Sequence, residues 1–306
     1  MKVSRLQIFL YLLPMLLTIL VINMTPIVYT LYLSFTNNTL FNDEYKFVGL
    51  ANYQRLLVGT DSGEFLQVLG LTVLYVVVCV SLFLIVGMLT ALALNNPRVK
   101  LQALWRGILL IPWATPYAIT VLIWKFLFNY DFGPINQILR IFFGPQAGIP
   151  WLTEPFWAFV GVVIVNVWLS YPFFMIVILG ALQSIPQELL EAASVDGATP
   201  WQSFWRVTLP LLRPALLPTT ILSSITTFQM FGAVYLITQG GPVTSADKPG
   251  ATSFVMIYVY NQILSGSAAN VQYAKIAAFA IILFIILGAL TFLARALGAK
   301  DKELYA

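Results

Sequence analysis

The side chains that could do chemistry in this sequence are few, and none forms a catalytic pattern. There is no histidine, and the single cysteine, Cys79, lies inside a long apolar run. Zinc centres, serine–histidine and cysteine–histidine catalysis, and a disulfide within the chain are therefore excluded. The phosphate loop G-x-x-x-x-G-K-[ST] is absent, and a turn explains Gly240-Gly241-Pro242 more simply than phosphate binding does. We expect no catalytic residue, metal or cofactor on this chain.

The twelve carboxylates all fall in polar segments or at the edges of apolar runs. A charged residue in the middle of a membrane span is costly and is kept only for function, as in proton-driven carriers. Its absence argues against a proton-coupled carrier, although sodium coupling through backbone carbonyls stays open. If the protein moves a solute, we expect its energy to come from another subunit.

The most distinctive polar segment is an insert between two apolar runs, residues 183–210. Pro186 and Glu188 suit the first turn of a helix, which we expect over Gln187 to Val195. Gly197 suits a left-handed helix terminator. The first half of the insert is therefore predicted to be one short, terminated helix.

The second half of the insert predicts another short helix. Thr199 can cap it, and we expect it to run from Pro200 to Thr208, where Leu209-Pro210 should stop it. Its 3.6-residue periodicity places four side chains on one face, suited to packing on the bundle or lying at the lipid interface: Trp201, Phe204, Trp205 and Thr208.

Neither helix of the insert reaches the ~12–15 residues at which an isolated helix becomes even marginal in water, so docking must stabilise both. Ala192 and Ala193 would let a partner approach closely, and Glu191 would offer it a fixed negative charge. The alternative is a solvated connector that merely links two spans.

The elements that hold these residues are apolar runs of membrane length. Hydrophobic residues make up 59% of the chain and charged residues 9%, against about 25% charged in a soluble domain, and the mean hydropathy is +0.86. The sequence predicts an all-α polytopic membrane bundle forming one domain, 1–306, with about six transmembrane helices: Ile8 to Leu33, Phe65 to Leu94, Leu104 to Phe128, Phe156 to Leu182, Leu211 to Ile237 and Ile276 to Ala296.

Three further expectations concern the remaining segments. The first run is too long for a signal peptide and reads as an uncleaved span. Residues 129–155 read as a loop rich in glycine and proline. The short apolar stretch 254–264 is interfacial or re-entrant, and the sequence leaves both options open.

Charge distribution predicts the orientation. The formal charge of +4 reflects the preference for basic residues in cytoplasmic loops, so no nucleic-acid partner is expected. With both termini in the cytoplasm, ten basic residues lie inside and six outside, and the insert is cytoplasmic. The inside set is Lys2, Arg5, Arg98, Lys100, Arg106, Arg206, Arg213, Arg295, Lys300 and Lys302; the outside set is Lys46, Arg55, Lys125, Arg140, Lys248 and Lys275.

The insert resembles a known family. Glu191-Ala192-Ala193, Gly197 and Leu209-Pro210 match the E-A-A-x3-G-x11-L-P pattern of the membrane subunits of binding-protein-dependent ABC importers. Other matches resemble the carbohydrate, maltose-permease-like branch: Asn166-x-Trp168-Leu169-x-Tyr171-Pro172, Gly180 to Pro186, Asp196-Gly197-Ala198 and Thr238-x-Gly240-Gly241-Pro242.

The resemblance implies a type I ABC importer permease fold in a prokaryotic inner membrane. It implies coupling to an ATPase subunit through Glu191, Ala192, Ala193, Asp196, Gly197, Leu209 and Pro210. The implied partners are a second homologous permease, two ATPase subunits that bind ATP and Mg, an extracytoplasmic solute-binding protein, a carbohydrate and the bilayer. The rival hypotheses are an ion-coupled secondary transporter and a membrane assembly or scaffold protein.

The resemblance also implies a mid-membrane sugar site, at Asn166, Leu169, Ser170, Phe173, Ser223, Thr227 and Met230. The family pattern has glycine at the Ser170 position, tyrosine at Phe173, and asparagine at Thr227 and Met230; replacing amides by a hydroxyl and a thioether removes partners for sugar hydroxyls.

From the residues alone, Asn166 is either a ligand contact or a bond between helices, and Met230 and Phe228 favour core packing. Trp124 and Trp168 could stack on a sugar or join an aromatic belt.

Overall fold

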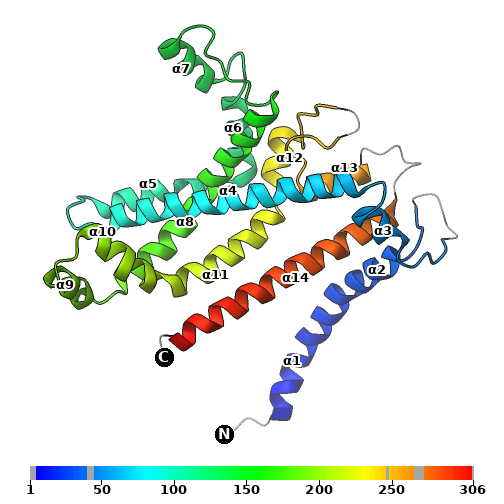
Figure 1. The fold of residues 1–306 in the computed structure, drawn as a ribbon, viewed down its shortest axis with the longest axis horizontal. Coiled ribbons are helices and arrows are strands. Elements are labelled where there is room, and N and C mark those ends of the chain that lie inside the picture. The colour runs from blue at the N-terminus through cyan, green and yellow to red at the C-terminus, as the bar shows by residue number, and fades with distance from the viewer. Residues whose placement is uncertain (1–4, 40–44, 246–247, 265–271, 305–306) are drawn as a thin grey trace. The chain divides into compact units, whose positions relative to one another are not determined.

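The computed structural model describes residues 5–39, 45–245, 248–264 and 272–304, with side chains described as far as Phe292. The described residues form helices and no named strand, which confirms the all-α prediction (Figure 1). In chain order they are α1 (Arg5–Ile19), the π-helix η1 (Leu20–Met24), α2 (Thr25–Ser34), α3 (Ala51–Leu57), α4 (Ser62–Asn95), α5 (Gln102–Ala114), α6 (Tyr117–Leu127), α7 (Pro134–Phe143), α8 (Pro155–Gln183), α9 (Gln187–Val195), α10 (Pro200–Ser203), the π-helix η2 (Phe204–Thr208), α11 (Leu209–Phe228), α12 (Gly232–Thr238), α13 (Val255–Leu264) and α14 (Tyr273–Leu304).

Each predicted span falls on a helix or helix pair of membrane length. Four are long, apolar helical runs, namely Arg5–Ser34, Ser62–Asn95, Pro155–Gln183 and Tyr273–Phe292. The other two are bent pairs: α5 and α6 meet at 91°, and the run Pro200–Phe228 meets α12 at 43°. The first bend has a simple cause, because Thr115 precedes Pro116 and takes the extended conformation that a following proline imposes. The third and fifth predicted spans are thus each broken rather than continuous.

The chain divides into two compact units, 1–65 with 259–289, and 66–258 with 290–306. In the first unit the buried Asn52 side chain donates to the carbonyls of Ser34 and Thr36 (2.9 and 2.7 Å), tying α3 to the end of α2. Asp61 lies 3.3 Å from Arg55 and 3.1 Å from Lys275, joining α3 to the start of α14. Whether the chain folds as one domain stays a prediction.

The second unit is built around α8. Helices α5 and α11 pack on it, and α4 runs beside them (Figure 1). The rings of Phe83 and Phe174 lie 5.8 Å apart in the core, and the Tyr171 hydroxyl donates to the carbonyl of Leu109 on α5 (3.0 Å). A Cβ on Gly87 would stand 2.6 Å from the Cβ of Phe174, so the absent side chain lets α4 and α8 approach closely.

The segment 129–155 corrects the prediction of a plain loop, because it contains the ten-residue helix α7. Pro134 occupies its first turn, where a missing N–H does no harm, and Gly144 ends it with φ of 98°. The glycines and prolines that suggested a loop therefore mark the ends of a helix. The short apolar stretch 254–264 forms helix α13, and residues 246–247 and 265–271 on either side of it lie outside the described residues.

Candidate functional site

The first half of the insert has the predicted structure. Helix α9 spans Gln187–Val195, and Gly197 follows it with φ of +78°. Three backbone N–H groups close its last turn, because Asp196, Gly197 and Ala198 donate to carbonyls within α9 (3.0, 3.1 and 2.9 Å). The bond from Ala198 to Ala193 spans five residues, as in a Schellman motif. The turn that separates the two short helices is therefore fixed by hydrogen bonds.

The second half begins as predicted and ends differently. Thr199 and Gln202 form a reciprocal capping box, with bonds of 2.9 and 3.3 Å. The prediction that Leu209-Pro210 stops the helix is wrong. The π-helix η2 leads directly into α11, and the Leu209 N–H bonds to the Phe204 carbonyl. Pro210 then sits in the first turn of α11, where its missing N–H is tolerated.

The surface of the insert mixes acidic and apolar side chains. Glu191, Ala192 and Asp196 are exposed, whereas Ala193 is buried against its own chain, so only one of the two alanines is open to a partner. Leu209 and Pro210 are half-buried at the base of the insert. The predicted aromatic face forms one cluster, with ring centroids 5.5–6.3 Å apart: Trp201, Phe204 and Trp205. Large apolar side chains are also exposed here: Leu189, Leu190, Val195, Trp201 and Trp205.

Six of the seven residues predicted for the substrate site line one pocket of about 230 Å³ in the second unit. These are Leu169, Ser170, Phe173, Ser223, Thr227 and Met230. Five further residues line it that the sequence argument missed: Phe83, Trp113, Phe174, Leu222 and Thr226. Helices α4, α5, α8 and α11 therefore all contribute walls.

Both helix breaks border this pocket. Trp113 lies near the end of α5, two residues before Thr115, and Met230 lies between α11 and α12. The hydroxyl of Tyr117, the first residue of α6, donates to the sulfur of Met230 at 3.4 Å. Irregular backbone at membrane depth is tolerated where it is buried in protein or lines a cavity. Here the backbone at both breaks lies beside the pocket. Pro112, next to Trp113, was the sequence signal that could have indicated a broken helix, and hence a pocket, at this position.

Asn166 is the one predicted site residue that does not line the pocket. Its side chain is fully buried, one turn along α8 from Ser170, whose hydroxyl donates to the Asn166 Oδ1 at 3.3 Å. Among the described residues its Nδ2 has no hydrogen-bond partner, and the same holds for the buried hydroxyl of Tyr75. Contact between Asn166 and a sugar therefore stays a prediction.

Two other aromatic candidates lie away from the pocket lining. The rings of Trp124 and Trp168 stand 5.8 Å apart in an edge-on contact, so they pack on each other. Phe228 is buried in the core, as expected. The glycine cluster is a turn after α12, where the Thr252 hydroxyl donates to the Gly241 carbonyl at 2.6 Å.

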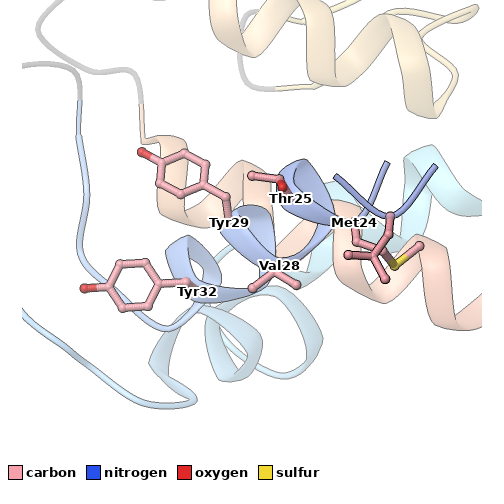
Figure 2. A pocket seen from close by; sticks show the side chains of 6 residues that line it. Met24, Thr25, Val28, Tyr29 and Tyr32 are labelled. Atoms are coloured by element: carbon pink, nitrogen blue, oxygen red, sulfur yellow. The ribbon is translucent and has the colours of Figure 1, made fainter. Parts of the chain in front are cut away.

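A larger, apolar hollow of about 520 Å³ lies in the first unit (Figure 2). All its lining residues come from the single helical run η1–α2, where Tyr29 and Tyr32 project from α2 and Met24 and Val28 complete the wall. Walls that converge from several elements are typical of ligand sites, and this hollow lacks them among its described lining residues. We therefore place the candidate site in the smaller pocket.

Membrane-length helices, two of them broken beside a small pocket, define a polytopic membrane transport protein. The chain belongs to the family described as binding-protein-dependent transport system inner membrane component, whose sequence profile matches residues 83–300. The resemblance of the insert to this family is thereby confirmed.

The relatives agree with this assignment. The trehalose/maltose transport system permease protein MalF of Thermococcus litoralis is 38% identical over 253 residues, covering 83% of this chain and 82% of that protein. The maltodextrin transport system permease protein MdxF of Bacillus subtilis is 31% identical, covering 92% of this chain and 66% of that protein. A chain in the crystal structure of a bacterial ABC transporter that imports the acidic polysaccharide alginate shares the fold, with a TM-score of 0.71 at 19% identity over 96% of this chain and 95% of that one.

Proposed function

We propose that this chain is a permease subunit of an ATP-driven importer and carries a neutral sugar, oligosaccharide or glycoside. The observation that carries the proposal is the lining of the pocket. Aromatic rings of Phe83, Trp113 and Phe173 share it with hydroxyls of α8 and α11, and none of the described lining residues is charged.

This composition suits a carbohydrate for two physical reasons. The C–H faces of a sugar ring pack on aromatic rings, and each sugar hydroxyl both donates and accepts, as the serine and threonine hydroxyls of the wall do. An acidic sugar would need a cationic partner, so the uncharged lining favours a neutral substrate over a uronic acid of the alginate kind. The maltodextrin and trehalose/maltose names of the relatives support the same class.

The insert would couple ATP hydrolysis to transport. An ATPase subunit would receive α9, with Glu191 facing a basic residue and Ala192 allowing close approach. Two such subunits would bind ATP and Mg, a second homologous permease would complete the path, and an extracytoplasmic binding protein would deliver the sugar. The insert and both termini would then lie in the cytoplasm, in agreement with the excess of basic residues on that side.

Two threonines of α11 test the substrate site. Thr219 Oγ1 donates to the carbonyl of Ala215 at 2.8 Å and is not among the lining residues, whereas Thr227 makes no side-chain hydrogen bond to any described residue and lines the pocket. Thr227→Val removes a hydroxyl open to a ligand, and Thr219→Val removes one already bonded to its own helix. Loss of one neutral hydrogen bond is worth about 0.5–1.5 kcal/mol, or roughly two- to tenfold in affinity.

The measurement is ATP hydrolysis by the reconstituted importer, stimulated by sugar-loaded binding protein. The half-saturating concentration of sugar-loaded binding protein should rise roughly two- to tenfold for Thr227→Val and stay unchanged for Thr219→Val. Stimulation by no carbohydrate would contradict the substrate class. Ion-driven uptake without ATPase subunits would favour the secondary-transporter alternative, and the absence of both activities would favour a scaffold.

A further inference from the structure

Helix α7 has its polarity reversed relative to a surface helix of a soluble protein. Asn136 is fully buried, and Arg140 is half-buried on the same side. The opposite side, which we call the outer face of α7, consists of Ile138, Ile141 and Phe142, exposed by 54, 77 and 76%. In water such a helix would turn its apolar face inward, so the surroundings of the outer face must be apolar.

Two polar side chains prevent the helix from rolling to bury that face. The Asn136 Nδ2 donates to the carbonyls of Asn129, Tyr130 and Ile149 (3.4, 3.3 and 2.9 Å). Its Oδ1 accepts from the Ile149 N–H at 3.0 Å and the Trp151 Nε1 at 3.2 Å.

Arg140 adds a second anchor on the inner side. Its two terminal nitrogens donate to the carbonyls of Tyr130 and Asp131 (2.9 and 3.2 Å), and the guanidinium stands 4.9 Å from the centre of the Tyr130 ring. The outer face is therefore held outward by bonds on the inner side.

The outer face continues an apolar stripe on the helix before it. On α6, four exposed side chains recur at the helical spacing of three and four residues: Ile119, Leu122, Ile123 and Phe126. The ring of Phe126 then stands 6.2 Å from that of Phe132, an exposed residue two positions before α7. The stripe of a membrane-spanning helix pair thus leads into α7 through one ring contact.

We propose that α7 lies in the lipid interface, with its outer face among the acyl chains. A transient protein partner fits less well, because transient protein interfaces are no more apolar than ordinary surface, and the outer face carries no charge among Ile138, Ile141 and Phe142. Helices of this kind bury their apolar face about 5–10 Å into the boundary between headgroups and acyl chains.

The position of α7 agrees with an interfacial role. Within the second unit it lies at the opposite end from α9 (Figure 1), so under the proposed orientation it meets the outer leaflet. The depth of α7 in the membrane does not depend on the substrate or on the ATPase. The interfacial position of α7 can therefore be wrong while the proposed function is right, and the proposed function can be wrong while the interfacial position is right.

Spin labels on single introduced cysteines test the proposal. The full chain, within its importer, is reconstituted into vesicles of phosphatidylethanolamine and phosphatidylglycerol and labelled at Ile141→Cys, or at Ile138→Cys as a second reporter. The matched control is Gln146→Cys, an exposed polar position just after α7. The unmodified chain serves as the blank, because its native Cys79 is buried.

The expected result is greater relaxation by oxygen than by a water-soluble nickel chelate at 141 and 138, and the reverse order at 146. Adding sugar-loaded binding protein should leave the labels at 141 and 138 unchanged. Nickel accessibility at 141 equal to that at 146 would overturn the proposal. Protection of 141 that develops only with the binding protein would assign the outer face to protein docking instead.

Discussion

The turn after α9 allows one backbone position to be tested almost in isolation. Gly197 has φ of +78°, a region where an L-residue is disfavoured by roughly 1–2 kcal/mol. A Cβ placed there would meet no atom within 4 Å, so Gly197→Ala adds no clash and its effect is conformational alone. An energy of 1–2 kcal/mol changes the ratio of closed to open turn by about 5- to 30-fold.

Hydrogen–deuterium exchange measures that ratio directly. The amides of Asp196, Gly197 and Ala198 are bonded to carbonyls of α9 only while the turn is closed. Exchange of a peptide spanning them should therefore quicken about 5- to 30-fold in Gly197→Ala. The exchange rate in Gly197→Asn should lie between those of the unmodified protein and Gly197→Ala, because asparagine tolerates the left-handed conformation better than alanine.

A second glycine provides the control. Gly180 lies in α8 with helical geometry and is exposed, and a Cβ added to it would also meet no atom within 4 Å, so Gly180→Ala should leave the turn unchanged. Equal exchange in Gly197→Ala and the unmodified protein would refute the view that the left-handed residue holds the turn. If α9 docks on an ATPase subunit as proposed, the Gly197→Ala variant should also show weaker coupling between ATP hydrolysis and uptake.

Two further substitutions probe the other structured elements. Asn136→Ala removes the buried side chain that joins the ends of segment 129–155 and leaves Trp151 Nε1 without its acceptor, so we expect a loss of about 1–3 kcal/mol, measured as a lower melting temperature and new protease cleavage within this segment. Glu191→Ala should uncouple ATP hydrolysis from uptake without changing membrane insertion, and Glu188→Ala in the first turn of α9 is its control; normal uptake in the Glu191 variant would contradict docking through this carboxylate.

Local signals were enough to predict the ends of helices where one residue has one backbone preference. Pro186 before α9 and Gly197 after it bracket a helix whose observed bounds equal the predicted ones. Thr199 caps the next helix, because its side chain accepts a hydrogen bond from the Gln202 N–H, which has no partner within the helix. These preferences act within a few residues, so they can be read without knowledge of the fold.

The pocket could be predicted only in part, because its walls come from four helices far apart in sequence. The resemblance to the family supplied the pocket positions on α8 and α11. Phe83 and Trp113 could be assigned to the pocket only from the structure, which packs α4 and α5 beside those two helices. Asn166 shows the opposite limit. Its residue type suits a sugar, but its angular position on α8 turns it into the core, and sequence periodicity in an apolar helix does not reveal which side faces the path.

The prolines show why a reliable local rule failed at the base of the insert. Proline normally ends a helix, yet Pro26 and Pro210 each lie inside a continuous helical run. In both cases a five-residue π-helix, η1 or η2, ends two residues before the proline. The wider turn changes which carbonyl each N–H reaches, so a proline can begin a new α-helical segment without ending the run. The second half of the insert thus continues into α11 without a break in the helical run, and α11 carries Ser223 and Thr227 at the pocket.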